Sequence, residues 1–124
     1  MEKKALKLGV ALCLCSSVAW ADSTDDAVAR ANRSAYRLAM ECFVAEGVAR
    51  GYDLHVGDTA RADALERRAR VSFDTAMKLG DELGYSGTRM NEDLGLTQSA
   101  EVPKFDHDVN YLKSQIAKCE SVGI

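Results

Sequence analysis

The chain has 124 residues, one proline, 28% charged residues and a formal net charge of −3. A chain of this length is expected to form one domain, and it lacks the clear basic stripe that nucleic-acid binding requires. The composition therefore predicts a small globular protein and argues against nucleic acid as a partner.

Residues 1–21 predict a cleaved export signal. The start is lysine-rich, residues 8–15 are apolar apart from one glycine, and Ala19 and Ala21 are the small residues that signal peptidase requires. A retained membrane anchor is the alternative, but the apolar run is shorter than the ~20 residues that span a bilayer. We expect a bacterial periplasmic or secreted protein whose single mature domain is residues 22–124, with no stable membrane insertion after processing.

The expected cleavage also determines which cysteines remain. It removes Cys13 and Cys15 and leaves Cys42 and Cys119, a pair that predicts a disulfide in an oxidising compartment. Two free buried thiols are the alternative. Neither residue belongs to a Cys-x-x-Cys motif, so the sequence does not indicate thiol–disulfide exchange activity.

Apolar residues spaced three and four apart predict helices and no strands. The first helix is expected from a Ser23-Thr24 cap to Gly51, and the second from about Asp58-Thr59 to Gly84. In both cases glycine followed by tyrosine, Gly51-Tyr52 and Gly84-Tyr85, is typical of a left-handed glycine cap.

A shorter third helix is expected from about Gly87 to Glu101. Pro103 then either starts the fourth helix or kinks a helix that joins the third and fourth. The fourth helix carries apolar residues from Phe105 to Cys119 and ends at Gly123. The expected fold class is all-α: a small helical bundle of three long helices plus one short helix, with one disulfide linking the first and last helices.

Counting along the apolar positions from the two cysteines predicts that the first and last helices run parallel. This register pairs Ala35 with Leu112, a small residue with a large one. It also places His55 and His107 at opposite ends of the bundle and His107 far from Met40. The register therefore argues against a shared metal site and against a haem held by Met and His.

No cofactor, metal site or catalytic residue is expected. The chain contains no Cys-x-x-Cys-His haem attachment, no Gly-x-Ser-x-Gly elbow and no glycine-rich phosphate loop. We therefore expect a protein that is not an enzyme.

One connecting segment is a candidate partner-binding loop. Between Gly51 and Asp58 the chain carries Tyr52, Leu54, His55 and Val56, which make it more apolar than a connector needs to be. The alternative is that these side chains fold back over the helix ends. In addition, eight arginines between residues 30 and 70 form either solvated helix faces or a basic patch for an acidic partner.

These features favour an exported protein-binding module with an unidentified protein partner. The chain is small, predicted to be helical and expected to contain one disulfide. In these respects it is similar to the periplasmic immunity proteins that neutralise type VI secretion amidases. It also resembles small helical acid chaperones, so an envelope stress chaperone is the alternative. Neither resemblance depends on a sequence motif, and the sequence leaves the oligomeric state open.

Overall fold

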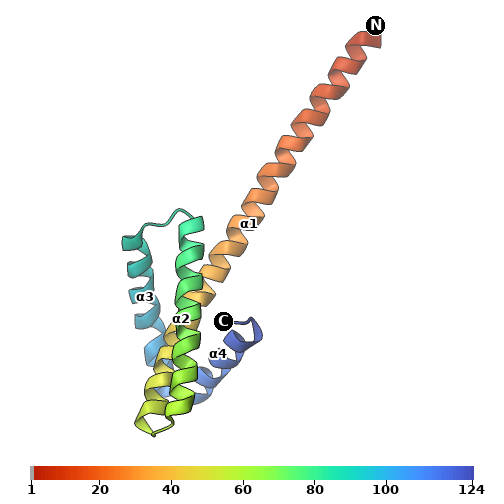
Figure 1. Cartoon of the computed structure of the whole chain (residues 1–124). Helices are drawn as coiled ribbons and strands as arrows, with labels where there is room; N and C mark the ends of the chain where they lie inside the picture. The colour runs from red at the N-terminus through yellow and green to blue at the C-terminus, as the bar shows by residue number, and fades with distance from the viewer. Residues whose placement is uncertain (1) are drawn as a thin grey trace. The chain divides into compact units, whose positions relative to one another are not determined.

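The computed structural model describes the backbone of residues 2–124 and the side chains of residues 24–124 (Figure 1). Over this range it contains four helices and no strand. These are α1 (Glu2–His55), α2 (Thr59–Glu82), α3 (Gly87–His107) and α4 (Val109–Ser121). The all-α fold class is confirmed, as is the link between the first and last helices, whereas the helix lengths differ from those expected.

The chain divides into two units, Met1–Asn32 and Arg33–Ile124. Residues 2–32 of the first unit have helical backbone and belong to α1, so the helix start expected at Ser23-Thr24 is wrong. The predicted export signal, residues 1–21, lies outside the part of the chain whose side chains are described. Among the described residues, no helix combines the length and apolarity that a membrane span needs. The second unit contains the helical bundle.

Glycine caps end three helices, but not all at the expected positions. The glycines with positive φ are Gly57, Gly84 and Gly123. The cap at Gly84 is confirmed, whereas the cap expected at Gly51 is wrong because α1 continues for another turn. At Gly57 the backbone N–H bonds to the carbonyl of Leu54 at 3.3 Å, and that of Asp58 bonds to the carbonyl of Asp53 at 2.8 Å. This is the paired hydrogen bonding that satisfies the last carbonyls of a helix.

Side-chain caps set the starts of α2, α3 and α4. Asp58, Ser86 and Asp108 each accept a hydrogen bond at 3.1 Å from the backbone N–H three residues later. The cap at Asp108 decides where α3 ends. The helix continues through Pro103 to His107, so α3 is long and α4, with 13 residues, is the short helix. The sequence had predicted the reverse.

The four helices of this unit alternate in direction along the chain. Tyr36 of α1 bonds to Asp93 of α3, and further along both helices Phe105 packs against Val44 and Ala45. The single residue Asp108 then joins α3 to α4. With so short a connection, α4 returns along its neighbours.

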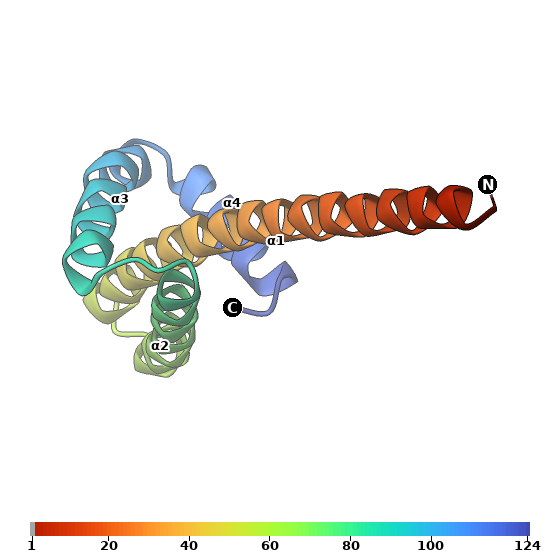
Figure 2. The ribbon, with the colours of Figure 1, turned by 90° about the horizontal axis from the view of Figure 1, so that it is seen from above.

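The last helix therefore runs antiparallel to α1, as the two ribbon views agree (Figures 1 and 2). Leu112 clusters with Val44 and Ala45, on the C-terminal side of Cys42, and not with Ala35. The parallel register inferred from the sequence is wrong. A pattern of small and large residues is compatible with either direction, whereas the short connection after α3 favours reversal, and the contacts of Leu112 with Val44 and Ala45 establish it.

Two hydrophobic clusters form the core. One consists of Tyr36, Ala39, Met40 and Ala76, the other of Val44, Ala45, Phe105 and Leu112. α1 contributes to both clusters and is therefore the central element of the bundle. The disulfide half-cystines, which are themselves fully buried, attach α4 to this central helix.

Candidate functional site

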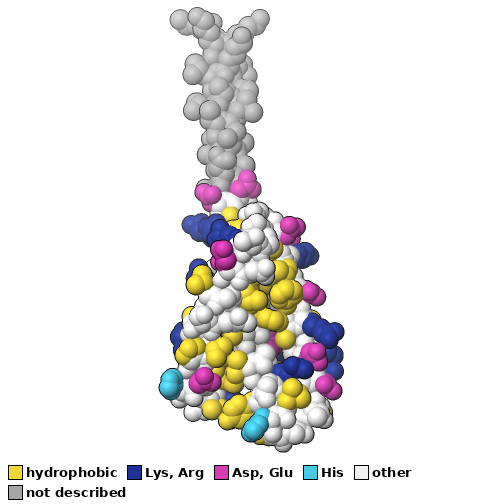
Figure 3. Space-filling view, turned by 90° about the vertical axis from the view of Figure 1, so that its left-hand side faces the viewer, with side chains coloured by type: hydrophobic (Ala, Val, Ile, Leu, Met, Phe, Trp, Pro, Cys, Tyr) yellow, Lys and Arg dark blue, Asp and Glu magenta, His cyan; other side chains and the backbone are white. Residues whose placement is uncertain are grey.

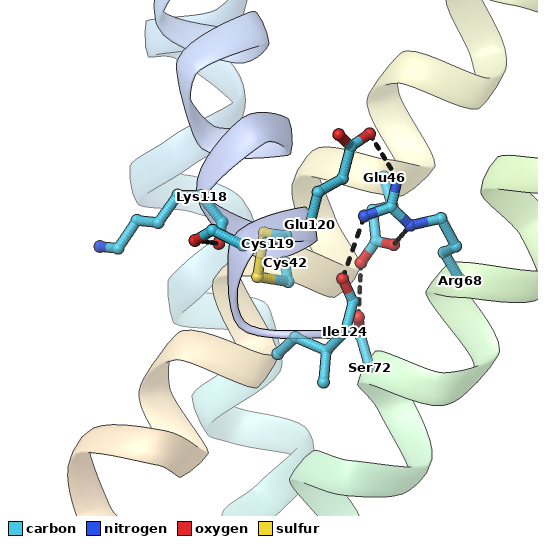
Figure 4. Close-up of a disulfide and its surroundings, with 9 residues drawn as sticks. Cys42, Glu46, Arg68, Ser72, Lys118, Cys119, Glu120 and Ile124 are labelled. Carbon is cyan, nitrogen blue, oxygen red and sulfur yellow. Dashed lines mark hydrogen bonds and ion pairs between the residues drawn. A yellow bond between two sulfur atoms is a disulfide. The ribbon is translucent and has the colours of Figure 1, made fainter.

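The predicted disulfide is confirmed and lies in the interior of the bundle (Figure 4). Cys42 of α1 and Cys119 of α4 are bonded, their Cα atoms lie 5.8 Å apart, and neither side chain is exposed. The bond is a covalent cross-link between α4 and the central helix α1.

A fully buried glutamate lies beside this disulfide. Glu46 follows Cys42 by one helical turn and is 0% exposed. Ser72 of α2 donates its hydroxyl to Glu46 Oε1 at 2.5 Å, and Arg68 Nε lies 3.8 Å from Oε2. Burial raises the pKa of the Glu46 carboxyl, while the Ser72 hydrogen bond and the Arg68 charge act in the opposite direction.

Arg68 joins this carboxylate to the end of the chain. Its Nη1 donates to Glu120 Oε1 at 2.6 Å and its Nη2 donates to the carbonyl of Ile124 at 3.2 Å. One guanidinium group thus connects α2 to Glu46 of α1, to α4 and to the last residue (Figure 4). Glu120 is exposed to solvent, whereas Glu46 is fully buried, so Glu46 is the carboxylate of this cluster whose charge is removed from water.

Sequence reasoning identified the cysteines and missed Glu46. A signal was present, since Glu46 stands four residues after Cys42 and shares its helix face. Ser72 also belongs to the inward face of α2. A charged residue is ordinarily assigned to the surface, so its burial becomes evident only when the three helices are brought together.

The chemistry open to this cluster depends on its redox state. Ligand atoms of Cys42, Glu46 and Cys119 all lie within 4.8 Å of one another, and this is the only such group of three or more among the described side chains. With the disulfide formed, both sulfurs are engaged in a covalent bond, so thiolate ligands are not available.

The candidate partner-binding segment is exposed but is not a loop. Tyr52, Leu54 and His55 belong to the last turn of α1, and Val56 lies in the turn that follows. Tyr52, Leu54 and Val56 are 59%, 46% and 65% exposed, so they face solvent and do not fold back over the helix end. We call Tyr52, Leu54, His55 and Val56 the apolar tip. Figure 3 shows histidine side chains near the lower end of the view, with hydrophobic side chains between them.

The charged groups that border the apolar tip already have partners. Arg61 Nε lies 3.4 Å from Asp53 Oδ2, and Arg50 lies 3.9 Å from Glu66. Asp58 is engaged as the N-cap of α2. The apolar tip is therefore bordered by groups that neutralise one another.

A further feature, which the sequence did not predict, is a cleft of about 370 Å³ between α1 and α3. Its wall includes the hydrogen bond of 2.8 Å from the Tyr36 hydroxyl to Asp93, and burial followed by this bond raises the pKa of Tyr36. Arg33, Arg37 and Arg89 also line the cleft. Arg33 and Arg37 form no ion pair among the described side chains, so they could bind a carboxylate or phosphate.

The three residues weighed for metal or haem chemistry are not brought into one site. Met40 is buried in the hydrophobic core, His55 ends α1 and His107 ends α3. Because α1 and α3 run in the same direction, both helices end at the same end of the bundle. The placement of His55 and His107 at opposite ends, expected from the parallel register, is therefore wrong. Neither histidine belongs to a group of three or more potential metal ligands among the described side chains.

Comparison with known protein families, with curated proteins and with solved structures finds no match to this chain. The functional argument therefore depends on the surfaces and clusters of the bundle itself.

Proposed function

We propose that this protein is an exported binding module that holds a protein partner through the apolar tip, as an inhibitor or immunity-type protein does. The observation that carries the proposal is the exposure of Tyr52, Leu54 and Val56 within one five-residue stretch. Large apolar side chains that lie together on a surface favour a protein–protein contact, and tyrosine is among the residues enriched in such contacts.

The surroundings of the apolar tip define the kind of partner. The neighbouring charges pair among themselves, at Asp53–Arg61 and Arg50–Glu66, so a partner gains little by offering a strong charge of either sign. The complementary surface is therefore expected to be an apolar pocket or groove that accepts Tyr52 and Val56, with polar groups only at its rim.

The buried glutamate weighs against the alternative of an acid-activated envelope chaperone. That function calls for a bundle that loosens as the pH falls. Because the pKa of Glu46 is raised in the folded state, its protonation in acid removes a burial cost, and this group stabilises the fold relative to neutral pH. The effect of Glu46 is thus opposite to the one that the chaperone would need.

The binding proposal is tested by site-specific photo-crosslinking in living cells. A crosslinking amino acid at Tyr52 should give one adduct of defined mass, and Val56→Asp in the same protein should abolish it. A crosslinker at Lys113, an exposed position on α4, is the matched control. Circular dichroism of the Val56→Asp protein shows whether the helical fold is retained.

The outcomes separate a specific contact from general stickiness. An adduct that forms equally from Tyr52 and Lys113, or that survives Val56→Asp in a folded protein, would overturn the assignment of the apolar tip. Cell fractionation and intact mass test the export part separately. Export with cleavage after Ala21 requires a mature chain that begins at Asp22.

A further inference from the structure

We propose that the protein, once its disulfide is reduced, binds one Zn²⁺ ion through Cys42, Cys119 and Glu46. The metal site lies in the interior of the bundle and is independent of the proposed partner-binding function. Three observations support it: the proximity of the three side chains, the unused bonding capacity of the glutamate and the charge balance of the buried cluster.

The first observation is geometric. The ligand atoms of the three residues lie within 4.8 Å of one another, and all three residues are 0% exposed. Donors around a tetrahedral zinc ion, at about 2.3 Å for sulfur and about 2.0–2.2 Å for oxygen, lie roughly 3.5 Å apart. The two sulfurs, bonded to each other in the disulfide, must move apart to this spacing after reduction, which rotation of the cysteine side chains can supply. Cys42 and Glu46 share one helix face, and Cys119 already lies against them (Figure 4).

The second observation is that the Glu46 carboxylate is incompletely bonded. Oε1 accepts the hydrogen bond from Ser72, whereas Oε2 is buried and forms no hydrogen bond within the protein. A buried acceptor without a hydrogen bond is uncommon in proteins. The Ser72 contact would also orient the carboxylate, as outer hydrogen bonds do for the ligands of known metal sites.

The third observation is the charge of the cluster. Reduction by a dithiol or a phosphine converts the disulfide into two thiols and consumes two electrons and two protons, and zinc binding then displaces the two thiol protons. The buried ligands, two thiolates and the Glu46 carboxylate, carry three negative charges, and Zn²⁺ and the Arg68 guanidinium 3.8 Å from Glu46 carry three positive charges. Arg68 also pairs with Glu120 at 2.6 Å, but that carboxylate is exposed and solvated. A dry interior tolerates a balanced set of charges far better than an unbalanced one.

The donor set also defines the class of metal. Two thiolates with one carboxylate favour Zn²⁺ and its analogue Co²⁺ over Mg²⁺ or Ca²⁺, which prefer oxygen donors alone. With three protein ligands, the fourth position around the ion stays open to a small ligand. The metal would replace the disulfide as the link between α1 and α4.

The test uses Co²⁺ as a spectroscopic probe on the fully reduced protein under nitrogen. Titration should produce the charge-transfer absorption of cobalt–thiolate bonds, saturating at one ion per chain, and Zn²⁺ should displace it. Glu46→Gln should weaken Co²⁺ binding at least tenfold, and Cys42→Ser should abolish it. Glu120→Gln is the matched control, because Glu120 adjoins Cys119 and contacts Arg68 but lies outside the ligand group.

Folding is followed in the same samples by far-ultraviolet circular dichroism. If reduction unfolds the chain, Zn²⁺ should restore the helical signal in the wild type and in Glu120→Gln, but not in Glu46→Gln. Absence of the charge-transfer absorption would overturn the proposal. So would equal Co²⁺ affinity of the wild type and Glu46→Gln, or equal binding by the oxidised and reduced proteins.

Discussion

Replacing Cys42 and Cys119 together by alanine should lower the free energy of unfolding by about 4–5 kcal/mol. The disulfide joins residues 77 positions apart, and a loop of that length corresponds to about 4.5 kcal/mol at 25 °C in the chain-entropy description. Few other contacts hold α4, whose buried residues are Leu112 and Cys119. The exposed ion pair of Glu120 with Arg68 adds about 1 kcal/mol at most.

Urea denaturation with linear extrapolation measures this change. Since the missing cross-link allows the unfolded chain to expand, the dependence of the free energy on urea should also become steeper in the variant. Wild-type protein in excess reductant without metal is the matched control and should lose a similar amount of stability. A loss below about 1.5 kcal/mol, or an unchanged urea dependence, would refute the argument that the bond acts mainly on the unfolded chain.

Four further substitutions test the bundle, three at buried positions and one, Gly47→Ala, at an exposed position of α1. Burial raises the pKa of Glu46 in the folded protein. The free-energy cost of burying its charge is therefore absent below the unfolded-state pKa of about 4.3 and increases as the pH rises through the pKa of the folded state. Urea denaturation should therefore show that, between pH 4 and pH 8, the wild type loses stability relative to Glu46→Gln. A difference in unfolding free energy between the two proteins that is the same at both pH values would contradict the raised pKa. Gly80→Ala should destabilise the protein by about 1–3 kcal/mol, since the new Cβ would overlap Met90 Sδ and lie 3.1 Å from the Tyr36 ring. Gly47→Ala, with no such neighbour within 4 Å, should stabilise α1 by about 0.5–1 kcal/mol, and thermal unfolding of the pair checks both signs. Tyr36→Phe should cost about 1 kcal/mol by removing the donor to Asp93, and it should remove part of the late phase of an absorbance titration, because burial raises the pKa of the Tyr36 phenol.

Local features of the fold were predictable from the sequence. The start of α2 at Asp58 and the cap at Gly84 follow from side-chain and glycine preferences that operate within one turn. The same local logic failed at Gly51, because a helix continues through glycine when the chain supplies a complete cap one turn later, at Gly57. Local signals are thus dependable for the existence of a helix and less dependable for its last turn.

The candidate site was predictable only in part. The pairing of Cys42 with Cys119 followed from their number and expected compartment, whereas the burial of Glu46 did not. Its burial requires Ser72 and Arg68, on a different helix, to be brought against the same face of α1. The cleft between α1 and α3 was missed for the same reason, since its walls come from segments far apart in the chain.

By itself the sequence determined the all-α class, the cysteine pair and the starts of α2 and α3, because each depends on periodicity, residue type or a cap within a few positions. Only the tertiary structure decided the direction of α4, the path through Pro103 and the environment of Glu46. The physical reason is that an apolar helix face can pack in either direction. The choice between the two is made by the one-residue connection at Asp108 and by the contacts that it brings together.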